Sequence, residues 1–185
     1  MATLYLSGYL FASKIQHRQY LKQLPMLKQL PMIEISEPQL NQASLCEPIL
    51  RLLPKWFGIE SAIIRYVQEI EHLPTLLAWS QEQLVGFLAI KQHNEFAAEI
   101  YVIAVHPQFH RQGIGWQLVE AAEKELRKLG VEYFQVKTLG SSSPDPNYAK
   151  TREFYESVGF KPLEEFLNLW EGNPCLQMVK SLPAG

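Results

Sequence analysis

Two glycines spaced one residue apart form a turn of the kind that can hold a phosphate. In the segment VHPQFHRQGIGWQL, Gly113 and Gly115 follow an apolar run that stops at Pro107, and they precede a helix with periodic apolar residues. Glycine lets the backbone approach a ligand without interference from a Cβ atom. The first amides of a helix lack intrahelical partners and lie at its positive dipole end, where a pyrophosphate fits. A plain tight turn is the alternative, because a Gly-x-Gly alone is a weak signal.

This turn differs from the two better-known phosphate loops, since it has neither the Gly-Lys-Ser/Thr ending of a P-loop nor the third glycine of a Rossmann fingerprint. The segment instead resembles the acyl-CoA signature of the GNAT superfamily of N-acetyltransferases. That signature reads Val-x-Pro, two or three residues, and then Gln/Arg-x-x-Gly-x-Gly/Ala at the start of a helix. Its places are taken here by Val105, Pro107, His110, Gly113 and Gly115, with His110 at the usual Gln/Arg position.

A second signature of the superfamily follows in NYAKTREFYESVGF, which supplies Asn147, Tyr155, Gly159 and Phe160. The resemblance extends from about Met32 to Leu182 and implies that acetyl-CoA is the acyl donor. The residues that it implies at the coenzyme are Ile103, Ala104, Val105, His110, Arg111, Gln112, Gly113, Ile114, Gly115, Trp116, Asn147 and Tyr155.

Acyl transfer to an amine needs a base, because an alkylamine is largely ammonium at neutral pH. The resemblance implies Glu99, since a Glu six residues before the Val position acts as general base in some family members. With a reference pKa of about 4.3, Glu99 would need desolvation or a relaying water to serve as a base. A solvated Glu at a strand end is the other interpretation, and Glu95, His93 and His106 are the other candidate bases.

The resemblance also implies that Tyr155 is the general acid, because a Tyr on the matching helix points at the coenzyme sulfur. A phenol with a reference pKa of about 10 stays protonated at neutral pH. Packing with Phe154 and Val158 in an apolar cluster is the alternative role. By the same resemblance, a backbone N–H near Ile103 stabilises the oxyanion. Asn147 either bonds the cofactor arm or caps its helix.

The acceptor pocket is expected between the first two helices and the later strands. The segment LPKWFGIE places Trp56 and Phe57 in the connection between those helices. They are candidates for packing on the apolar part of an acceptor, and ordinary core packing is the equal alternative. The sequence contains no acidic cluster of the kind that would indicate a polyamine or aminoglycoside acceptor.

Apolar periodicity and turn residues predict the elements that position these residues. The predicted order is strand, two helices, three strands, helix, strand, helix and two strands, which is typical of a mixed-sheet α/β domain. The resemblance implies a mostly antiparallel central sheet, splayed at the cofactor site and flanked by helices. The helices are predicted over 39–53, 60–70, 114–129 and 147–158, and the strands over 32–36, 75–80, 84–92, 98–105, 132–139, 163–170 and 175–182.

The beginning of the chain differs from this regular pattern. The phrase LKQLPM occurs twice in succession, and each proline interrupts any helix there. We therefore expect residues 1–31 to be an appendage and residues 32–185 to form the acetyltransferase domain. Whether translation starts at Met1 or at Met32 stays open.

Composition narrows the class of protein. The chain has 185 residues, of which 47% are hydrophobic and 19% are charged, as in one ordinary globular domain. A net charge of −2 shows no basic excess of the kind that nucleic-acid binding needs. Cys46 and Cys175 match no metal spacing and are expected to be free thiols in a reducing compartment. The N-terminal apolar run is too short to span a membrane, so a cytoplasmic protein without a membrane partner is expected.

Together, these patterns predict an N-acetyltransferase that moves an acetyl group from acetyl-CoA to a primary amine of a small molecule or peptide. Glu99 is the expected general base and Tyr155 the expected general acid, and no metal is expected. A non-catalytic module that senses acyl-CoA is the alternative. The acceptor, the length of the acyl group and the choice between monomer and homodimer stay open.

Overall fold

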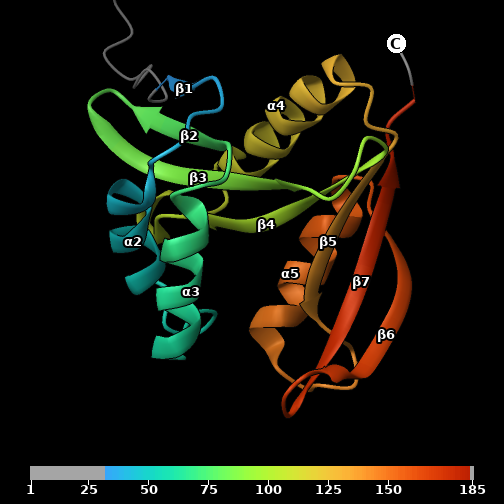
Figure 1. The fold of residues 1–185 in the computed structure, drawn as a ribbon. Helices are drawn as coiled ribbons and strands as arrows, with labels where there is room; N and C mark the ends of the chain where they lie inside the picture. The colour runs from blue at the N-terminus through green and yellow to red at the C-terminus, as the bar shows by residue number, and fades with distance from the viewer. Residues whose placement is uncertain (1–31, 184–185) are drawn as a thin grey trace, which may run out of the picture. The chain divides into compact units, whose positions relative to one another are not determined.

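The computed structural model describes residues 32–183, whose fold is drawn in Figure 1; the predicted appendage, residues 1–31, lies outside this range. Seven strands form one sheet in the order β1-β2-β3-β4-β5-β7-β6. Neighbouring strands are antiparallel except for β4 and β5, which are parallel. The predicted class, a mixed α/β domain with a mostly antiparallel sheet, is confirmed. The strands are β1 (Ile33–Ile35), β2 (Thr75–Ser80), β3 (Gln83–Gln92), β4 (Ala97–Val105), β5 (Tyr133–Leu139), β6 (Lys161–Trp170) and β7 (Asn173–Ser181).

The helices lie close to the predicted ranges, and a short 3-10 turn is added before the third of them. The first predicted helix begins four residues late, because the chain before it is held in other conformations. Gln39 forms an isolated bridge with Thr75, and Asn41 has a φ of 61°, which a right-handed helix does not allow. The elements are α2 (Ala43–Arg51), α3 (Glu60–Ile70), the turn η1 (Pro107–Phe109), α4 (Ile114–Lys128) and α5 (Pro146–Ser157).

The helices cover both faces of the sheet (Figure 1). On one face, α2 and α3 bury an apolar cluster against β2, β3 and β4, with Phe87 and Leu50 fully buried in it. On the other face, α4 and α5 pack over a larger cluster that includes Leu118, Phe134 and Tyr155. Burial of these two apolar surfaces is the main force that holds the helices on the sheet.

Two irregularities of β4 create the site. Ala89 of β3 pairs with Val102 and the next residue, Ile90, pairs with Ile100, so Tyr101 is the extra residue of a β-bulge. On its other side, β4 pairs with β5 only as far as Ile100, although both strands continue for several residues. Figure 1 shows the two strands diverging from that point. The predicted splay of the sheet is therefore present.

Within residues 32–183, no helix has the length and apolar content to cross a lipid bilayer. The same residues contain no cluster of three or more His, Cys, Asp or Glu side chains that could hold a metal ion. Cys46 and Cys175 are both buried free thiols, as the sequence predicts.

Candidate active site

The turn between β4 and α4 has the conformation that a phosphate loop needs. Gly113 is the N-cap of α4 and adopts a left-handed φ of 79°, while Arg111 before it has a φ of 62°. No atom lies within 4 Å of the place where a Cβ atom would stand on Gly113, so the turn leaves open space there. Because α4 is a helix of 15 residues, its first amides and its dipole face that space.

The side chains of the turn mostly hold the turn itself. The Nε2 atom of His110 donates to the carbonyl oxygen of Val105 at 2.7 Å. The amide of Gln112 donates to the carbonyl oxygen of Gln108 at 3.2 Å. The loop therefore offers a ligand mainly its backbone amides, with Arg111 as the exposed cation beside them.

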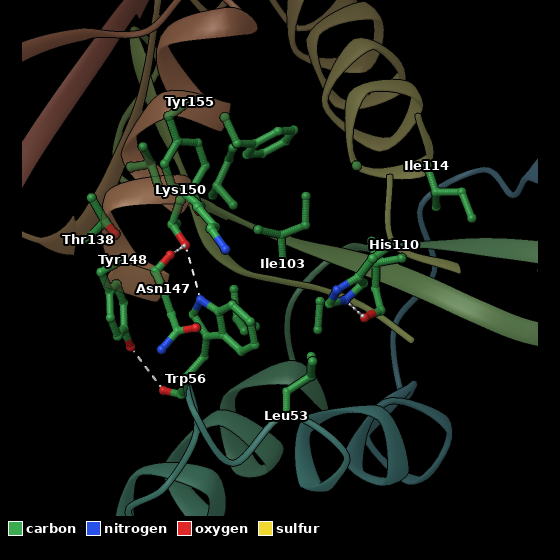
Figure 2. Close-up of a pocket in the computed structure, with 18 of the residues that line it drawn as sticks. Leu53, Trp56, Ile103, His110, Ile114, Thr138, Asn147, Tyr148, Lys150 and Tyr155 are labelled. Atoms are coloured by element: carbon green, nitrogen blue, oxygen red, sulfur yellow. Dashed lines mark hydrogen bonds between the residues drawn. The ribbon is translucent and has the colours of Figure 1, made fainter. Parts of the chain in front are cut away.

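A cavity of about 530 Å³ joins this turn to the gap between β4 and β5, and Figure 2 shows its lining. Neither Gln112 nor Glu99 is among the lining residues. The other predicted site residues all line the cavity, namely Trp56, Phe57, Ile103, Ala104, Val105, His110, Arg111, Gly113, Ile114, Gly115, Trp116, Asn147 and Tyr155.

Backbone N–H groups of β4 point into the gap. The N–H of His106 donates to the carbonyl oxygen of Val85 on β3 at 2.8 Å. Successive N–H groups of a strand point to opposite sides, so the N–H of Ala104 also points to β3. Those of Ile103 and Val105 point the other way, toward the diverging β5. This direction agrees with the backbone donor that the sequence predicts near Ile103.

Tyr155 of α5 is 5% exposed and packs at the edge of Phe160, with ring centroids 5.9 Å apart. Its hydroxyl has no hydrogen-bond partner among residues 32–183. Every fully buried side-chain oxygen or nitrogen in that range does have a partner, so the Tyr155 hydroxyl is not fully buried. The hydroxyl must therefore open into the cavity that Tyr155 lines. Burial raises the pKa of this phenol above its usual value, so it stays protonated.

Glu99 is 7% exposed and lies behind the cavity wall rather than on it. Its Oε2 atom accepts from Nε2 of His93 and from Nζ of Lys137, each at 2.7 Å, and from Nε2 of Gln135 at 3.5 Å. Gln135 is its partner in the parallel pairing of β4 and β5. Lys137 does line the cavity, so it lies between the carboxylate and the space.

The start of α5 is capped by Asp145, not by Asn147. The Oδ1 atom of Asp145 accepts from the backbone N–H of Asn147 at 2.7 Å and from that of Tyr148 at 3.3 Å. These bonds, that of Asn147 first, hold the pKa of Asp145 below its usual value. The helix-cap interpretation of Asn147 is therefore wrong, because Asp145 already satisfies those amides, and the Asn147 side chain lines the cavity instead.

Trp56 ties the connection between α2 and α3 to α5. Its Nε1 atom donates to Oγ1 of Thr151 at 3.0 Å, and the hydroxyl of Tyr148 donates to its carbonyl oxygen at 3.0 Å. Its ring also meets His110 edge-on, with ring centroids 6.1 Å apart. Figure 2 shows Trp56 reaching across the cavity toward α5. Trp56 is thus a cavity residue with structural bonds of its own.

Sequence reasoning missed several residues of the lining. Tyr148 directly follows Asn147, and Tyr101 lies inside the predicted strand, so proximity to predicted residues was a usable signal for both. No local pattern marks the others, which reach the cavity through long-range packing. The missed side chains that matter below are Tyr66, Tyr101, Lys137, Tyr148 and Lys150.

Several known proteins are similar to this chain in sequence and in fold. The family model described as acetyltransferase (GNAT) domain matches residues 71–162. Over 119 residues the chain is 34% identical to an uncharacterised N-acetyltransferase of Chlorobaculum tepidum, which covers 63% of this chain and 70% of that relative.

Two solved structures show the same fold. A protein described as a GNAT-family acetyltransferase from Desulfovibrio desulfuricans superposes with a TM-score of 0.72 at 18% identity, covering 82% of this chain and 100% of the other. A GNAT-family acetyltransferase from Elizabethkingia anophelis with acetyl-CoA bound gives 0.62 at 20% identity, covering 81% and 98%.

Proposed function

The chain belongs to the GNAT superfamily of N-acetyltransferases, and we propose that it acetylates a primary amine by direct attack, with Glu99 as general base and Tyr155 as general acid. As a family member it is an acetyl-CoA-dependent acyltransferase. The residue roles are our proposal. The observation that carries it is the Tyr155 hydroxyl, which is held deep in the fold, lacks a protein partner within residues 32–183 and opens into the cavity beside the β4–β5 gap.

The lining fits acetyl-CoA. A polyphosphate needs backbone amides and cations, and the turn at Gly113 offers the amides while Arg111 and Lys150 supply positive charge. Among residues 32–183, no Asp or Glu lines the cavity, so no acidic side chain of this range repels a phosphate there. The N–H of Ile103, pointing into the gap, is placed to stabilise negative charge on the acyl oxygen.

The proton steps are assigned to two side chains. Glu99 takes a proton from the acceptor ammonium and so frees the lone pair that attacks the acyl carbon. When the carbon–sulfur bond breaks, Tyr155 gives its proton to the leaving thiolate, and the second proton of the amine replaces it through solvent. Because Lys137 stands between Glu99 and the cavity, the first transfer runs through a water molecule. The Oε1 atom of Glu99 has no protein partner within residues 32–183 and is free to accept from that water.

Two glycines provide a matched test of cofactor binding. Gly113 and Gly130 have φ values of 79° and 76°, and neither has an atom within 4 Å of its virtual Cβ atom. Valine should strain the backbone equally at both positions, but only Gly113→Val places carbon atoms where the phosphates bind. Calorimetry should show acetyl-CoA affinity falling at least about tenfold in Gly113→Val alone. Equal affinity in the two folded variants would mean that the turn only connects two elements.

The acid role of Tyr155 is tested by Tyr155→Phe, which keeps the ring and removes the proton. Turnover should fall by roughly 10²-fold, the lower end of general-acid catalysis, and the loss should persist at high pH because the thiolate still leaves unprotonated. Acetyl-CoA affinity should stay unchanged, and Tyr133→Phe on β5, which is half exposed, serves as the control. Thiol release against pH measures this. Full activity in Tyr155→Phe would mean that the protein acts by positioning alone, whereas binding without turnover in the unmodified chain would favour a sensing module.

A further inference from the structure

Part of the cavity wall is built from aromatic side chains of four separate parts of the fold. These are the connection between α2 and α3, helix α3, strand β4 and helix α5. All of these rings are half-buried, so each keeps some surface open. An aromatic wall favours an acceptor with a flat, apolar body. We call this part of the wall the aromatic end; it consists of Trp56, Phe57, Tyr66, Tyr101 and Tyr148.

The rings of the aromatic end hold one another in place. Phe57 meets Tyr66 edge-on with ring centroids 5.6 Å apart, and Tyr66 meets Tyr101 in the same way at 5.7 Å. Tyr148 is fixed by its bond to the carbonyl oxygen of Trp56. The wall is therefore formed before an acceptor arrives, which lowers the ordering cost of binding.

The aromatic end shares two elements with the proposed base and the proposed acid. Tyr101 follows Glu99 by two residues on β4, and Tyr148 precedes Tyr155 by seven residues on α5, which places the two tyrosines on one face of that helix. Tyr101, Tyr148 and Tyr155 all line the cavity. An amine that reacts between Glu99 and Tyr155 therefore has the aromatic end beside it.

The charge of the wall selects against a polycation. No Asp or Glu of the described residues lines the cavity, and the buried carboxylate behind its wall, Glu99, is covered by Lys137. The ammonium of Lys137 has three N–H donors, of which Glu99 takes one. The acceptor thus meets a cation beside the base, which attracts a carboxylate and repels a second ammonium.

We propose that the acceptor is an aromatic α-amino acid, with its ring in the aromatic end, its α-carboxylate on Lys137 and its α-amine toward Glu99. In such a molecule one carbon separates the amine from the carboxylate, so a carboxylate bound to Lys137 would hold the amine within reach of the water that relays its proton to Glu99. This assignment rests on the transfer reaction proposed above and adds the substrate class to it.

The test uses the full chain, acetyl-CoA and four amines: L-phenylalanine, L-phenylalaninamide, L-alanine and spermidine. The amide keeps the ring and the α-amine but lacks the negative charge, while alanine keeps both charges and lacks the ring. Rates of thiol release are compared per unprotonated amine, because the amide is less basic. L-phenylalanine should give a kcat/KM at least about tenfold above each of the other three, the worth of one charge-assisted bond or one buried ring.

Two pairs of variants test which side chains cause the preference for phenylalanine. Lys137→Met should erase the difference between phenylalanine and its amide, even though both become slower through the disturbed Glu99; Lys161→Met, on exposed β6, should keep the difference. Tyr66→Leu should raise the KM for phenylalanine about tenfold without a similar loss of kcat, whereas Phe96→Leu, which is half exposed and outside the cavity, should not.

Calorimetry of acetyl-CoA binding distinguishes failure of the proposed function from failure of the acceptor assignment. If acetyl-CoA does not bind, the proposed function itself is wrong. If it binds and the amide, alanine or spermidine reacts as well as phenylalanine, or if none of the four reacts, the acceptor assignment is overturned. A Lys137→Met variant that still prefers phenylalanine over its amide would also overturn the assignment of the carboxylate.

Discussion

Two carboxylates are buried in this fold, and they are bonded in different ways. Glu123 of α4 is 6% exposed, and each of its oxygens has its own cation: Oε1 accepts from Lys180 of β7 and Oε2 accepts from Arg127 at 2.9 Å. Glu99 of β4 is equally buried at 7%, but all of its bonds go to Oε2.

This difference separates a structural pair from a reactive one. Glu123 joins α4 to β7, and Lys180 continues the link to the carbonyl oxygen of Val158 at 2.7 Å, so the network is complete. Because each oxygen of Glu123 is already bonded to a cation, a proton in transit would have to compete with a charged partner at either oxygen. Glu99 keeps one oxygen free, and its partner Lys137 stands at a cavity. Burial alone therefore does not indicate catalysis, whereas an incomplete set of bonds beside a cavity does.

The largest effect is expected for Glu99→Gln. Turnover should fall by roughly 10²–10⁴, because the amide cannot take the proton of the ammonium. The loss should shrink as pH rises, since the free amine then forms unaided. Lys137 loses its anion but keeps a neutral acceptor, so the free energy of unfolding should fall by about 2 kcal/mol, less than at a carboxylate that pairs with both a lysine and an arginine. A pH–rate profile and a denaturant melt measure the two quantities, and a rate loss that is constant over pH would remove Glu99 from the role of base.

The opposite pattern is expected for Glu123→Gln. This change leaves Lys180 and Arg127 without their anion, and breaking a buried pair costs about 3 kcal/mol of unfolding free energy. Turnover per folded molecule should stay within about twofold, because neither Glu123 nor its partners Lys180 and Arg127 line the cavity. A denaturant melt measures the unfolding free energy of Glu123→Gln, and thiol release from the same sample measures its turnover. If Glu123→Gln were stable but inactive, the contrast between the two carboxylates would fail.

The sequence predicts what is local and misses what depends on strand register. Helix α3 has the predicted bounds, and the turn at Gly113 lies at the predicted junction between a strand and a helix. Both are local features, because caps, glycines and apolar spacing act over a few residues. The bonds of Glu99 could not be predicted in this way. Lys137 reaches it only because β4 and β5 are parallel with Glu99 opposite Gln135, a register that no local pattern encodes.

The aromatic end shows the same limit. The sequence predicts Trp56 and Phe57 as candidate acceptor residues, with ordinary core packing as the equal alternative, because they lie in the connection between the first two helices. Tyr66 and Tyr101 are separated from them in sequence, and they reach the cavity only through the packing of α3 over β4. A sequence can therefore suggest which residues lie at a site without giving the charge of its wall, and that charge is what distinguishes one acceptor class from another.

The smallest effect on turnover is expected for a change at His93, a neighbour that Glu99 has and Glu123 lacks. Its Nε2 atom contacts Glu99 at 2.7 Å while the side chain is one-third exposed, so it connects the buried carboxylate to solvent. Glu123 has no such neighbour, since its partners are a lysine and an arginine, which do not give up protons near neutral pH. If Glu99 is the base, as proposed above, His93 is the side chain through which its proton would pass to solvent.

His93→Gln keeps a donor to Glu99 and removes the group that titrates. Turnover should fall by about tenfold or less, because solvent can still reach Glu99 slowly through the cavity. Added imidazole buffer should restore most of the rate, which a purely structural role would not allow. His72→Gln, at an exposed histidine that no assigned residue contacts, is the control and should show neither effect. If His93→Gln lost activity that imidazole could not restore, His93 would only hold Glu99 in place, and the two carboxylates would differ in their free oxygen alone.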